Sequence, residues 1–296
     1  ELPKRMRMRL GEIDIDGLLS PAAVEEYVTG SRKTAFPLLE FTERTDHFCQ
    51  GLLDGQVGLL VDGLPIGYLA PVSFGRLMRS PEDRATDYLS ASMLRSLRYL
   101  ALGVSLLLPG IYAAMAMFHQ QMLPTKLLLS IVESKQDVPF STLFEVVGLL
   151  CAFELLQQAG LHLPQAIGTA VSIIGGLVVG TAAVDAKLVS PAALIVTASS
   201  GICGFTLPNR ELSDALRLWR LGLTVLGGVF GLFGVTAGLL LLLIKLAGLE
   251  SLGRSYLAPF GEAEVKGALV RERLAEQKWR DGTLRPLDER NQRCRF

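Results

Sequence analysis

Charge is distributed very unevenly along this chain of 296 residues. Residues 1–95 carry 25 charged side chains and residues 250–296 carry 18, whereas residues 96–249 carry only 15. A helix that is stable in water needs a polar face as well as an apolar one, and the middle of the chain has too few charges to supply it. The sequence therefore predicts a membrane-embedded middle region between two polar ends.

The middle region contains five hydrophobic segments that are candidates for crossing a membrane. They are residues 97–118, 140–156, 164–184, 188–207 and 218–246. A helix needs about 20 apolar residues to cross roughly 30 Å of hydrocarbon, so the last three are strong predictions. Residues 140–156 form a short segment that carries two glutamates, which is typical of either a tilted span or a re-entrant helix.

Basic residues place both ends of the chain on the cytoplasmic side. Arginines crowd the entrance to the first segment, and the tail after Arg254 is rich in lysine and arginine, which favours the cytoplasm. Two cytoplasmic ends require an even number of crossings, but five segments are counted. If residues 140–156 do not cross, then Arg210, Arg217 and Arg220 fall on the outside, so the conflict stays open.

The first 95 residues read as a small α+β module. Residues 9–15 alternate like a strand, Pro21 to Val28 reads as a helix with Ser20 as N-cap, and residues 43–53 read as another helix. Residues 56–61 and 66–70 flank a turn in which Gly63 can adopt positive φ. The predicted fold is thus a cytoplasmic α+β module (1–95), an α-helical polytopic bundle of four to five membrane helices (96–249) and a basic cytoplasmic tail (250–296).

The sequence carries no recognisable enzyme motif. The formal net charge is zero, which gives no reason to expect a nucleic-acid partner. There is no phosphate-binding glycine loop and no HExxH, the three histidines are far apart in the sequence, and the four cysteines show no CxxC spacing. We therefore expect no catalytic residue, no metal and no cofactor.

Small residues recur at helical spacing in two of the hydrophobic segments. The positions are Gly168, Ser172, Gly176 and Gly180 in the first, and the pairs Gly227/Gly231 and Gly234/Gly238 in the second. Such faces let membrane helices approach closely. They pack either within one subunit, or between subunits and against a pore.

Glu145 and Glu154 are the two carboxylates inside a hydrophobic segment. They are nine residues apart, which is about 900° of helical rotation, so they project from opposite sides of a regular helix. An isolated carboxylate in lipid costs several kcal/mol, so each needs a cation, a proton or water. Either they border an ion path, or they form structural ion pairs with Lys126, Lys135 or Lys187.

The segment 188–207 is rich in small and hydroxyl side chains and ends in Pro208-Asn209. Such a helix could border water, although serine and threonine also bond back to helix carbonyls. Together with the two glutamates, the candidate ion-path residues are Ser199, Ser200, Thr206 and Asn209.

Short motifs in a fixed order run along nearly the whole chain. In the first hundred residues they are Ile15-Asp16-Gly17, Phe36-Pro37, Thr42-Glu43-Arg44 with Asp46, Leu52-Leu53-Asp54-Gly55-Gln56-Val57, Val61-Asp62-Gly63-Leu64-Pro65 and Arg95/Arg98. Further on they are Leu108-Pro109 with Tyr112, His119, Leu123-Pro124-Thr125, Val138-Pro139-Phe140, Glu145, Phe153-Glu154, Leu163-Pro164, Val189-Ser190-Pro191, Pro208-Asn209, Ser251-Leu252-Gly253 and Pro259-Phe260. By these motifs the chain resembles the A-subunit family of spore germinant receptors, the GerA type, which includes SpoVAF-like paralogues.

The resemblance implies a subunit of a receptor complex in the inner membrane of the bacterial spore. Its partners would be further copies of itself, a transporter-like B subunit and a lipoprotein C subunit. The implied activity is a nutrient-gated channel that releases monovalent cations. Family chains have a longer N-terminal region with an additional subdomain, and this sequence starts at the second subdomain.

Two departures from the family pattern stand out. Gln157 and Gln158 replace a charged pair before Ala159-Gly160, and Thr45 stands where a proline is usual. The resemblance therefore does not extend a charged coupling role to that loop, and a receptor subunit proper and a SpoVAF-like paralogue both stay open. Two other functions also stay open: a secondary transporter with breaks at Pro109 and Pro208, and a scaffold without a pore.

Overall fold

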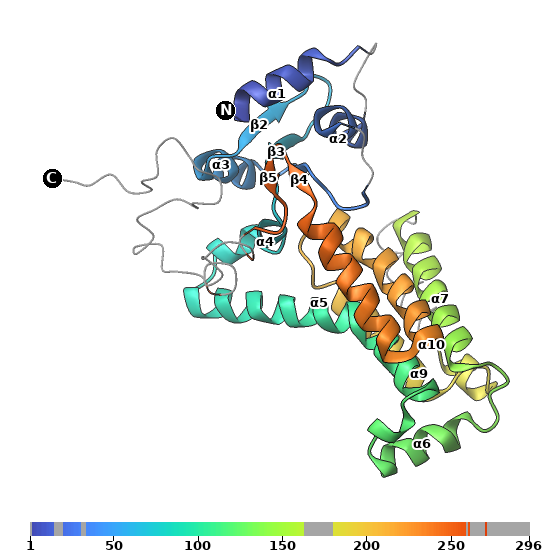
Figure 1. Cartoon of the computed structure of the whole chain (residues 1–296). Coiled ribbons are helices and arrows are strands. Elements are labelled where there is room, and N and C mark those ends of the chain that lie inside the picture. Colours follow the sequence, from blue (N-terminus) through green and yellow to red (C-terminus); the bar gives the residue numbers. More distant parts are fainter. Residues whose placement is uncertain are drawn as a thin grey trace. The chain divides into compact units, whose positions relative to one another are not determined.

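The computed structural model describes residues 2–14, 20–30, 34–162, 180–258, 260 and 270 of the chain (Figure 1). The chain forms two compact units. Unit 1 comprises Glu1–Tyr99, Pro208–Leu212 and Leu243–Phe296, and unit 2 comprises Leu100–Leu207 and Ser213–Leu242. The chain therefore leaves unit 1 twice and returns to it twice.

Unit 1 combines a three-stranded sheet with short helices. In chain order its elements are α1 (Leu2–Gly11), α2 (Pro21–Thr29), β1 (Glu40–Thr42), α3 (Thr45–Asp54), β2 (Val57–Leu60), β3 (Gly67–Ala70), α4 (Phe74–Leu77), η1 (Pro81–Arg84), the start of α5 (Tyr88–Met117), β4 (Glu250–Ser251) and β5 (Arg254–Ser255). The sheet order is β1-β3-β2 and both pairings are antiparallel. Tyr68 in the central strand lies opposite Phe41 on one side and Leu59 on the other.

Helices cover both faces of this sheet. Successive side chains of a strand point to opposite faces, and β3 follows this rule. Tyr68 and Ala70 join a core with residues of α1 and α2, whereas Gly67 and Leu69 lie against α3. The buried core on the first face consists of Met6, Val24, Val28, Leu39, Ile66, Tyr68 and Ala70.

Local sequence signals explain most of these elements. The Ser20 side chain accepts a hydrogen bond from the Ala23 amide at 3.2 Å and caps α2, which confirms the predicted helix start. The predicted helix over 43–53 appears as α3, and the predicted hairpin appears as β2 and β3 with Gly63 at φ 84°. The predicted strand over 9–15 is wrong, because residues up to Gly11 belong to helix α1, which buries Met6 against the core.

Residues 250–258 belong to unit 1, although the sequence analysis placed them in the charged tail. Strands β4 and β5 form a two-stranded hairpin. The Ser251 hydroxyl donates to the Leu38 carbonyl at 2.6 Å and accepts from the Val72 amide at 3.0 Å. Tyr256 is fully buried, and its carbonyl accepts from the Phe74 amide at 2.7 Å. The N-terminal residues and residues 250–258 therefore belong to the same unit.

The described secondary-structure elements of unit 2 are all helices. Its elements are the rest of α5, η2 (Gln120–Met122), α6 (Thr125–Lys135), α7 (Thr142–His162), α9 (Pro191–Gly204) and most of α10 (Arg210–Ala247). Helices α7 and α9 pack through Val146, Leu149, Leu150 and Ala193 (Figure 1). Among the described residues, three helical stretches are long and apolar enough to cross a membrane: Tyr88–Met117, Thr142–Ala159 and Arg210–Ala247, the last of which is interrupted at Gly231.

Helix α10 reverses its direction at Gly231. The backbone there has φ 66° and ψ −152°, which breaks the helix. Gly234 packs against the Leu226 carbonyl and Gly238 packs against the Leu223 side chain, although a continuous helix would separate the residues of each pair by about 12 Å or more. The sequence predicted a single span over 218–246, and that prediction is wrong. The segment is a hairpin of two antiparallel helices, residues 210–230 and 232–247.

The other hydrophobic segments fare differently. Segments 97–118 and 140–156 fall in α5 and α7, apart from residue 118 and residues 140–141, which lie just outside these helices. Segment 188–207 contains α9, which has 14 residues and a length of about 21 Å. Most of segment 164–184 lies outside the described residues, which resume at Gly180.

Candidate functional site

Glu145 is completely buried near the start of α7. Its side chain is 0% exposed, and one carboxylate oxygen accepts a hydrogen bond from the Ser190 amide at the N-terminus of α9. Its other oxygen lies 3.7 Å from the Lys135 ammonium, which also bonds to Thr142. A carboxylate at a helix N-terminus is favoured by the helix dipole. Of the three lysines considered from the sequence, the structure pairs Glu145 with Lys135.

Glu154 has a different environment two and a half turns further along α7. Its side chain is 37% exposed and lies 3.2 Å from the Arg217 guanidinium of α10. Arg217 also contacts Asp214 at 3.1 Å and is itself only 15% exposed. In the amide orientation that its surroundings favour, Gln157 accepts a further hydrogen bond from Arg217 at 2.8 Å. The partner of Glu154 is thus an arginine and none of the three lysines.

A second arginine of α10 is buried among apolar helices. Arg220 is 7% exposed and lies 3.4 Å from the Ser200 hydroxyl of α9. Ser200 in turn donates to the Ser105 carbonyl of α5 at 2.7 Å. Arg217 and Arg220 are three residues apart and share a helix face. Together with Glu154, these residues form a polar layer that joins α5, α7, α9 and α10.

The remaining hydroxyl candidates are dispersed. Ser199 is half-buried on α9, and Thr206 is exposed and bonds back to the Cys203 carbonyl at 2.8 Å. Asn209 caps α10 by accepting from the Leu212 amide at 2.9 Å. Of the four predicted residues Ser199, Ser200, Thr206 and Asn209, only Ser200 belongs to the polar layer. The structure therefore does not bring the predicted ion-path residues together as one set.

The described glycines either allow close packing of helices or, at Gly231, form the reversal of α10. Gly227 lies against the Gly110 carbonyl of α5, where an added methyl group would be 2.5 Å from that oxygen. Gly234 and Gly238 face the other half of the α10 hairpin, and Gly180 faces Leu194. Gly231 forms the reversal itself, so its assignment to a helix-packing face is corrected. Gly168, Ser172 and Gly176 lie outside the described residues.

Sequence reasoning did not assign Arg217, Arg220 and Ser105 to a site. The signal that could have identified the arginines is their three-residue spacing at the start of the apolar segment 218–246. Ser105 could not have been found this way, because it contributes its backbone carbonyl rather than its side chain.

Unit 1 has its own buried ionic group at the start of α5. Asp83 is 1% exposed and accepts two hydrogen bonds from Arg98, at 2.7 and 2.8 Å. Burial alone would raise the pKa of Asp83, but the hydrogen bonds and charge of Arg98 outweigh it and hold that pKa below its usual value. Asp83 also caps η1 by accepting from the Ser80 amide, so it fixes the segment that enters α5.

No three histidine, cysteine or acidic side chains cluster as a metal site would require, within the part of the chain that the structure describes. The geometry defines a chain with two units, one polar and one made of apolar helices that are long enough to cross a membrane and that carry buried charges. Residues 1–283 match the model of the Bacillus/Clostridium GerA spore germination protein family. The chain belongs to this family.

Several curated relatives are similar over most of the chain. It is 37% identical to the uncharacterized membrane protein YfkQ of Bacillus subtilis (strain 168), over 94% of the chain and 55% of that protein. It is 38% identical to spore germination protein KA of the same organism, over 90% of the chain and 50% of that protein. It is 35% identical to spore germination protein XA of Bacillus anthracis, over 99% and 60%. The chain thus spans little more than half the length of these relatives, and no solved structure matches it.

Proposed function

We propose that this chain is a membrane subunit of a spore germination receptor complex and that copies of it assemble into a nutrient-gated channel for monovalent cations. The complex lies in the inner membrane of the spore and includes a transporter-like B subunit and a lipoprotein C subunit. Membership of the GerA family and the relatives named for spore germination support the role in germination. The proposal of a channel is based on the polar layer of unit 2.

The observation that carries the channel proposal is the contrast between the two glutamates. Glu145 is 0% exposed and caps a helix, so it is a structural group. Glu154 keeps 37% of its side chain exposed on the surface of an apolar helix, next to a largely buried arginine. An ionisable group in a membrane helix is costly unless it faces protein or water. Glu154 is therefore the carboxylate available to a permeating cation or a neighbouring subunit.

The apolar surface of unit 2 supports assembly. Only about a third of the most apolar window of α5 and of α10 is buried within the chain. Large side chains of the α10 hairpin, Phe230, Phe233 and Leu240, are 60–76% exposed. These faces are left for lipid or for other subunits.

The α10 hairpin supports a topology of six passes. In chain order the passes are α5, α7, the predicted segment 164–184, α9 and the two halves of α10. Six is an even number, as two cytoplasmic ends require. The division into units is consistent with this number, because the chain leaves unit 1 after Tyr99 and after Leu212 and returns to it at Pro208 and at Leu243. Four passes precede Pro208 and two follow Leu212.

This topology removes the conflict over the arginines of α10. With six passes, Arg210 lies at the cytoplasmic start of the hairpin, and Arg217 and Arg220 lie in its cytoplasmic half, as the positive-inside rule favours. The contacts at the far end are consistent. Lys187 pairs with Asp137, and His119 packs against Gly231, so the three outer connections meet within unit 2.

Cysteine labelling tests the topology. A single cysteine at Lys187 should react with a membrane-impermeant thiol reagent added outside intact cells, whereas a cysteine at Arg254 should react only after permeabilisation. The four native cysteines are first replaced by serine, and expression of that parent is the control. Labelling of position 254 from outside would refute the cytoplasmic placement of the chain after α10, and with it this topology.

Conductance tests the channel. The full-length protein in planar bilayers should give discrete cation currents, and Glu154→Gln should change their size or cation selectivity while the protein stays folded. Glu145→Gln is the matched comparison, and we expect it to reduce the yield of folded protein because it weakens the cap of α9. Saturable flux without discrete currents would indicate a secondary transporter. The absence of any cation current from a folded oligomer that still assembles with its partners would indicate a scaffold.

A further inference from the structure

The first three turns of helix α5 carry an exposed apolar stripe. These turns, residues 88–99, belong to unit 1. The large side chains that they leave exposed are Leu89, Met93, Leu94 and Leu97, at 66%, 70%, 43% and 50%. Leu89, Met93 and Leu97 follow at four-residue intervals and therefore share one helix face, which Leu94 widens. We call these four residues the α5 stripe.

The opposite face of the same turns is buried and charged. Ala91 and Arg95 are buried, and the side chain of Arg98 is only 13% exposed. The carboxylate of Asp83 lies 3.5 Å from Arg95 and 2.7 Å from Arg98. A helix on the surface of a water-soluble domain shows the reverse arrangement, with its apolar face inward. Here the arginines face unit 1 and the aliphatic side chains point away from it.

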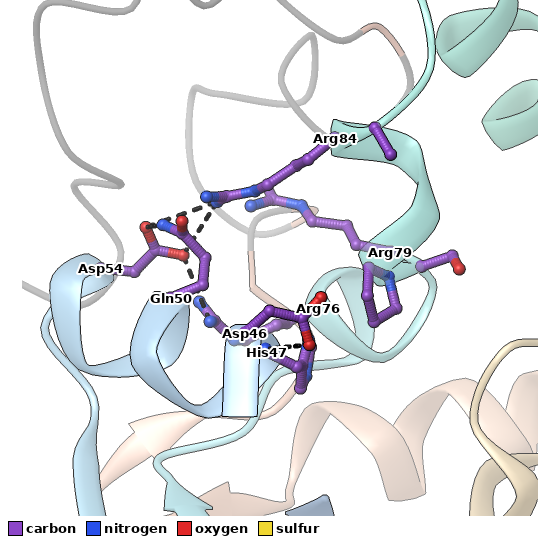
Figure 2. A pocket seen from close by; sticks show the side chains of 10 residues that line it. Asp46, His47, Gln50, Asp54, Arg76, Arg79 and Arg84 are labelled. Atoms are coloured by element: carbon purple, nitrogen blue, oxygen red, sulfur yellow. Dashed lines mark hydrogen bonds and ion pairs between the residues drawn. The ribbon is translucent and has the colours of Figure 1, made fainter. Parts of the chain in front are cut away.

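Neighbouring ion pairs fix the direction in which the stripe points. Arg84 of η1 lies 3.2 Å from the carboxylate of Asp54 on α3, as Figure 2 shows. Arg76 of α4 lies 3.2 Å from the same carboxylate. Asp83 of η1 then connects these elements to α5 through two hydrogen bonds from Arg98. A rotation of α5 that buried the stripe would break this buried ion pair, which is costly.

Helix α5 is longer than a membrane crossing requires. Its 30 residues measure about 45 Å, whereas the hydrocarbon core is roughly 30 Å thick. Residues 100–117 alone measure about 27 Å. Residues 88–99 are therefore not needed to cross the hydrocarbon, and they include the whole stripe.

The composition of these turns fits the boundary between lipid and water. Residues 88–99 contain no acidic side chain, and their exposed positions outside the stripe are Ser90 and Ser96. An amphipathic helix at a bilayer surface buries its apolar face between the headgroups and the acyl chains. The stripe also lies on the same continuous helix as the residues that are apolar enough to cross a membrane.

The stripe is too small to form a stable protein interface by itself. Even an aromatic side chain buries only about 150–250 Å², so four partly exposed aliphatic side chains present less than the roughly 800 Å² that each partner of a stable interface contributes. Such interfaces are also enriched in tyrosine, tryptophan and arginine, and the stripe has none of these. Its area and its composition therefore favour lipid over a second copy of the chain.

We propose that the α5 stripe contacts the interfacial region of the lipid bilayer, between the headgroups and the acyl chains. The contact gives unit 1 an attachment to lipid of its own, because Asp83 and Arg98 hold these turns of α5 to that unit. This inference rests on the proposed membrane location of α5, but it does not depend on channel activity.

The accessibility of spin labels tests the proposal, with the full chain in nanodiscs of phosphatidylcholine. The native cysteines are replaced by serine, and a nitroxide is attached to the single cysteine of Met93→Cys. Oxygen dissolves among acyl chains whereas a nickel chelate stays in water, so lipid contact raises the ratio of oxygen to nickel accessibility. Leu60→Cys is the matched control, because Leu60 is 71% exposed and lies on β2 of unit 1, outside the stripe.

We expect the ratio to be several-fold higher for Met93→Cys than for Leu60→Cys, and Leu89→Cys should agree with Met93→Cys. Equal ratios at Met93 and Leu60 would mean that the stripe faces water and would overturn the proposal. Low accessibility of the Met93 label to both reagents would also overturn it, because a second copy of the chain or a partner protein would then cover the stripe.

Leu240→Cys provides the reference for the membrane location itself, because Leu240 is 60% exposed on the second half of α10. If the nickel chelate reaches this label as readily as the Leu60 label, the proposed membrane location fails and the stripe proposal fails with it. A Leu240 label in lipid together with a Met93 label in water would refute only the contact of the stripe and would leave the proposed function intact.

Discussion

The reversal of α10 makes a quantitative prediction for Gly231→Ala. At φ 66° and ψ −152° the backbone is in a region that is open essentially only to glycine, and any other residue pays about 1–3 kcal/mol there. A methyl group at this position would also lie 2.8 Å from the His119 ring and 3.3 Å from Phe118. With both effects we expect a loss of about 2–3 kcal/mol in the free energy of unfolding. The ratio of folded to unfolded protein would fall roughly 30- to 150-fold.

Gly222→Ala is the matched control, because it makes the same chemical change in the same helix. Gly222 lies in regular helix, and nothing lies within 4 Å of the position that a methyl group would take. Alanine is favoured over glycine in a helix by about 0.8–1.0 kcal/mol, so this variant should be as stable as wild type or slightly more stable.

Reversible unfolding in mixed detergent micelles, followed by circular dichroism, measures both variants against wild type. Gly231→Ala should unfold at a clearly lower denaturant fraction, and Gly222→Ala should not. Equal stability of Gly231→Ala and wild type would refute the hairpin, since a continuous helix would accept alanine at both positions.

Two further predictions concern unit 1. Ser251→Ala leaves the Leu38 carbonyl and the Val72 amide buried without this hydrogen-bond partner, so it should destabilise unit 1 by about 2–4 kcal/mol in a thermal melt. Ser255→Ala, at an exposed position, should have little effect. Equal melting of the two variants would mean that β4 does not anchor the chain after α10. Because the pKa of Asp83 is lowered in the folded state, its stabilising contribution is present above its unfolded pKa of about 3.9 and is lost as the pH falls through the folded pKa. The free energy of unfolding of Asp83→Asn should therefore be about 3 kcal/mol lower than that of wild type at pH 7, and this difference should shrink on acidification. A difference that does not change with pH would exclude the ion pair with Arg98 as its cause.

Much of unit 1 was predictable because its signals are local. The Ser20 cap, helix α3 and the hairpin around Gly63 each depend on residues within a few positions of one another. The strand predicted over 9–15 failed because a short alternation does not distinguish a strand from a helix that buries few of its side chains. Strand β1 has only three residues, and its partners in β3 lie 25 to 29 positions later, so no local pattern predicts it.

The candidate site was predictable in its residue types but not in its geometry. The sequence shows that Glu145 and Glu154 lie in an apolar segment, but their environments depend on Ser190 and Lys135 in one case and on Arg217 in the other. Arg217 is 63 positions from Glu154 in the chain. Which carboxylate is structural and which is accessible therefore follows from helix packing alone.

The sequence by itself determined that the middle of this chain is apolar enough to form membrane-spanning helices, because hydropathy depends only on composition and length. Its motifs also determined the family. Only the tertiary structure decided the direction of the chain, because an apolar run such as 218–246 has the same composition whether it continues through Gly231 or turns back. Only the tertiary structure likewise joined residues 250–258 to unit 1 and paired Glu154 with Arg217, because these contacts link elements that are distant in the sequence.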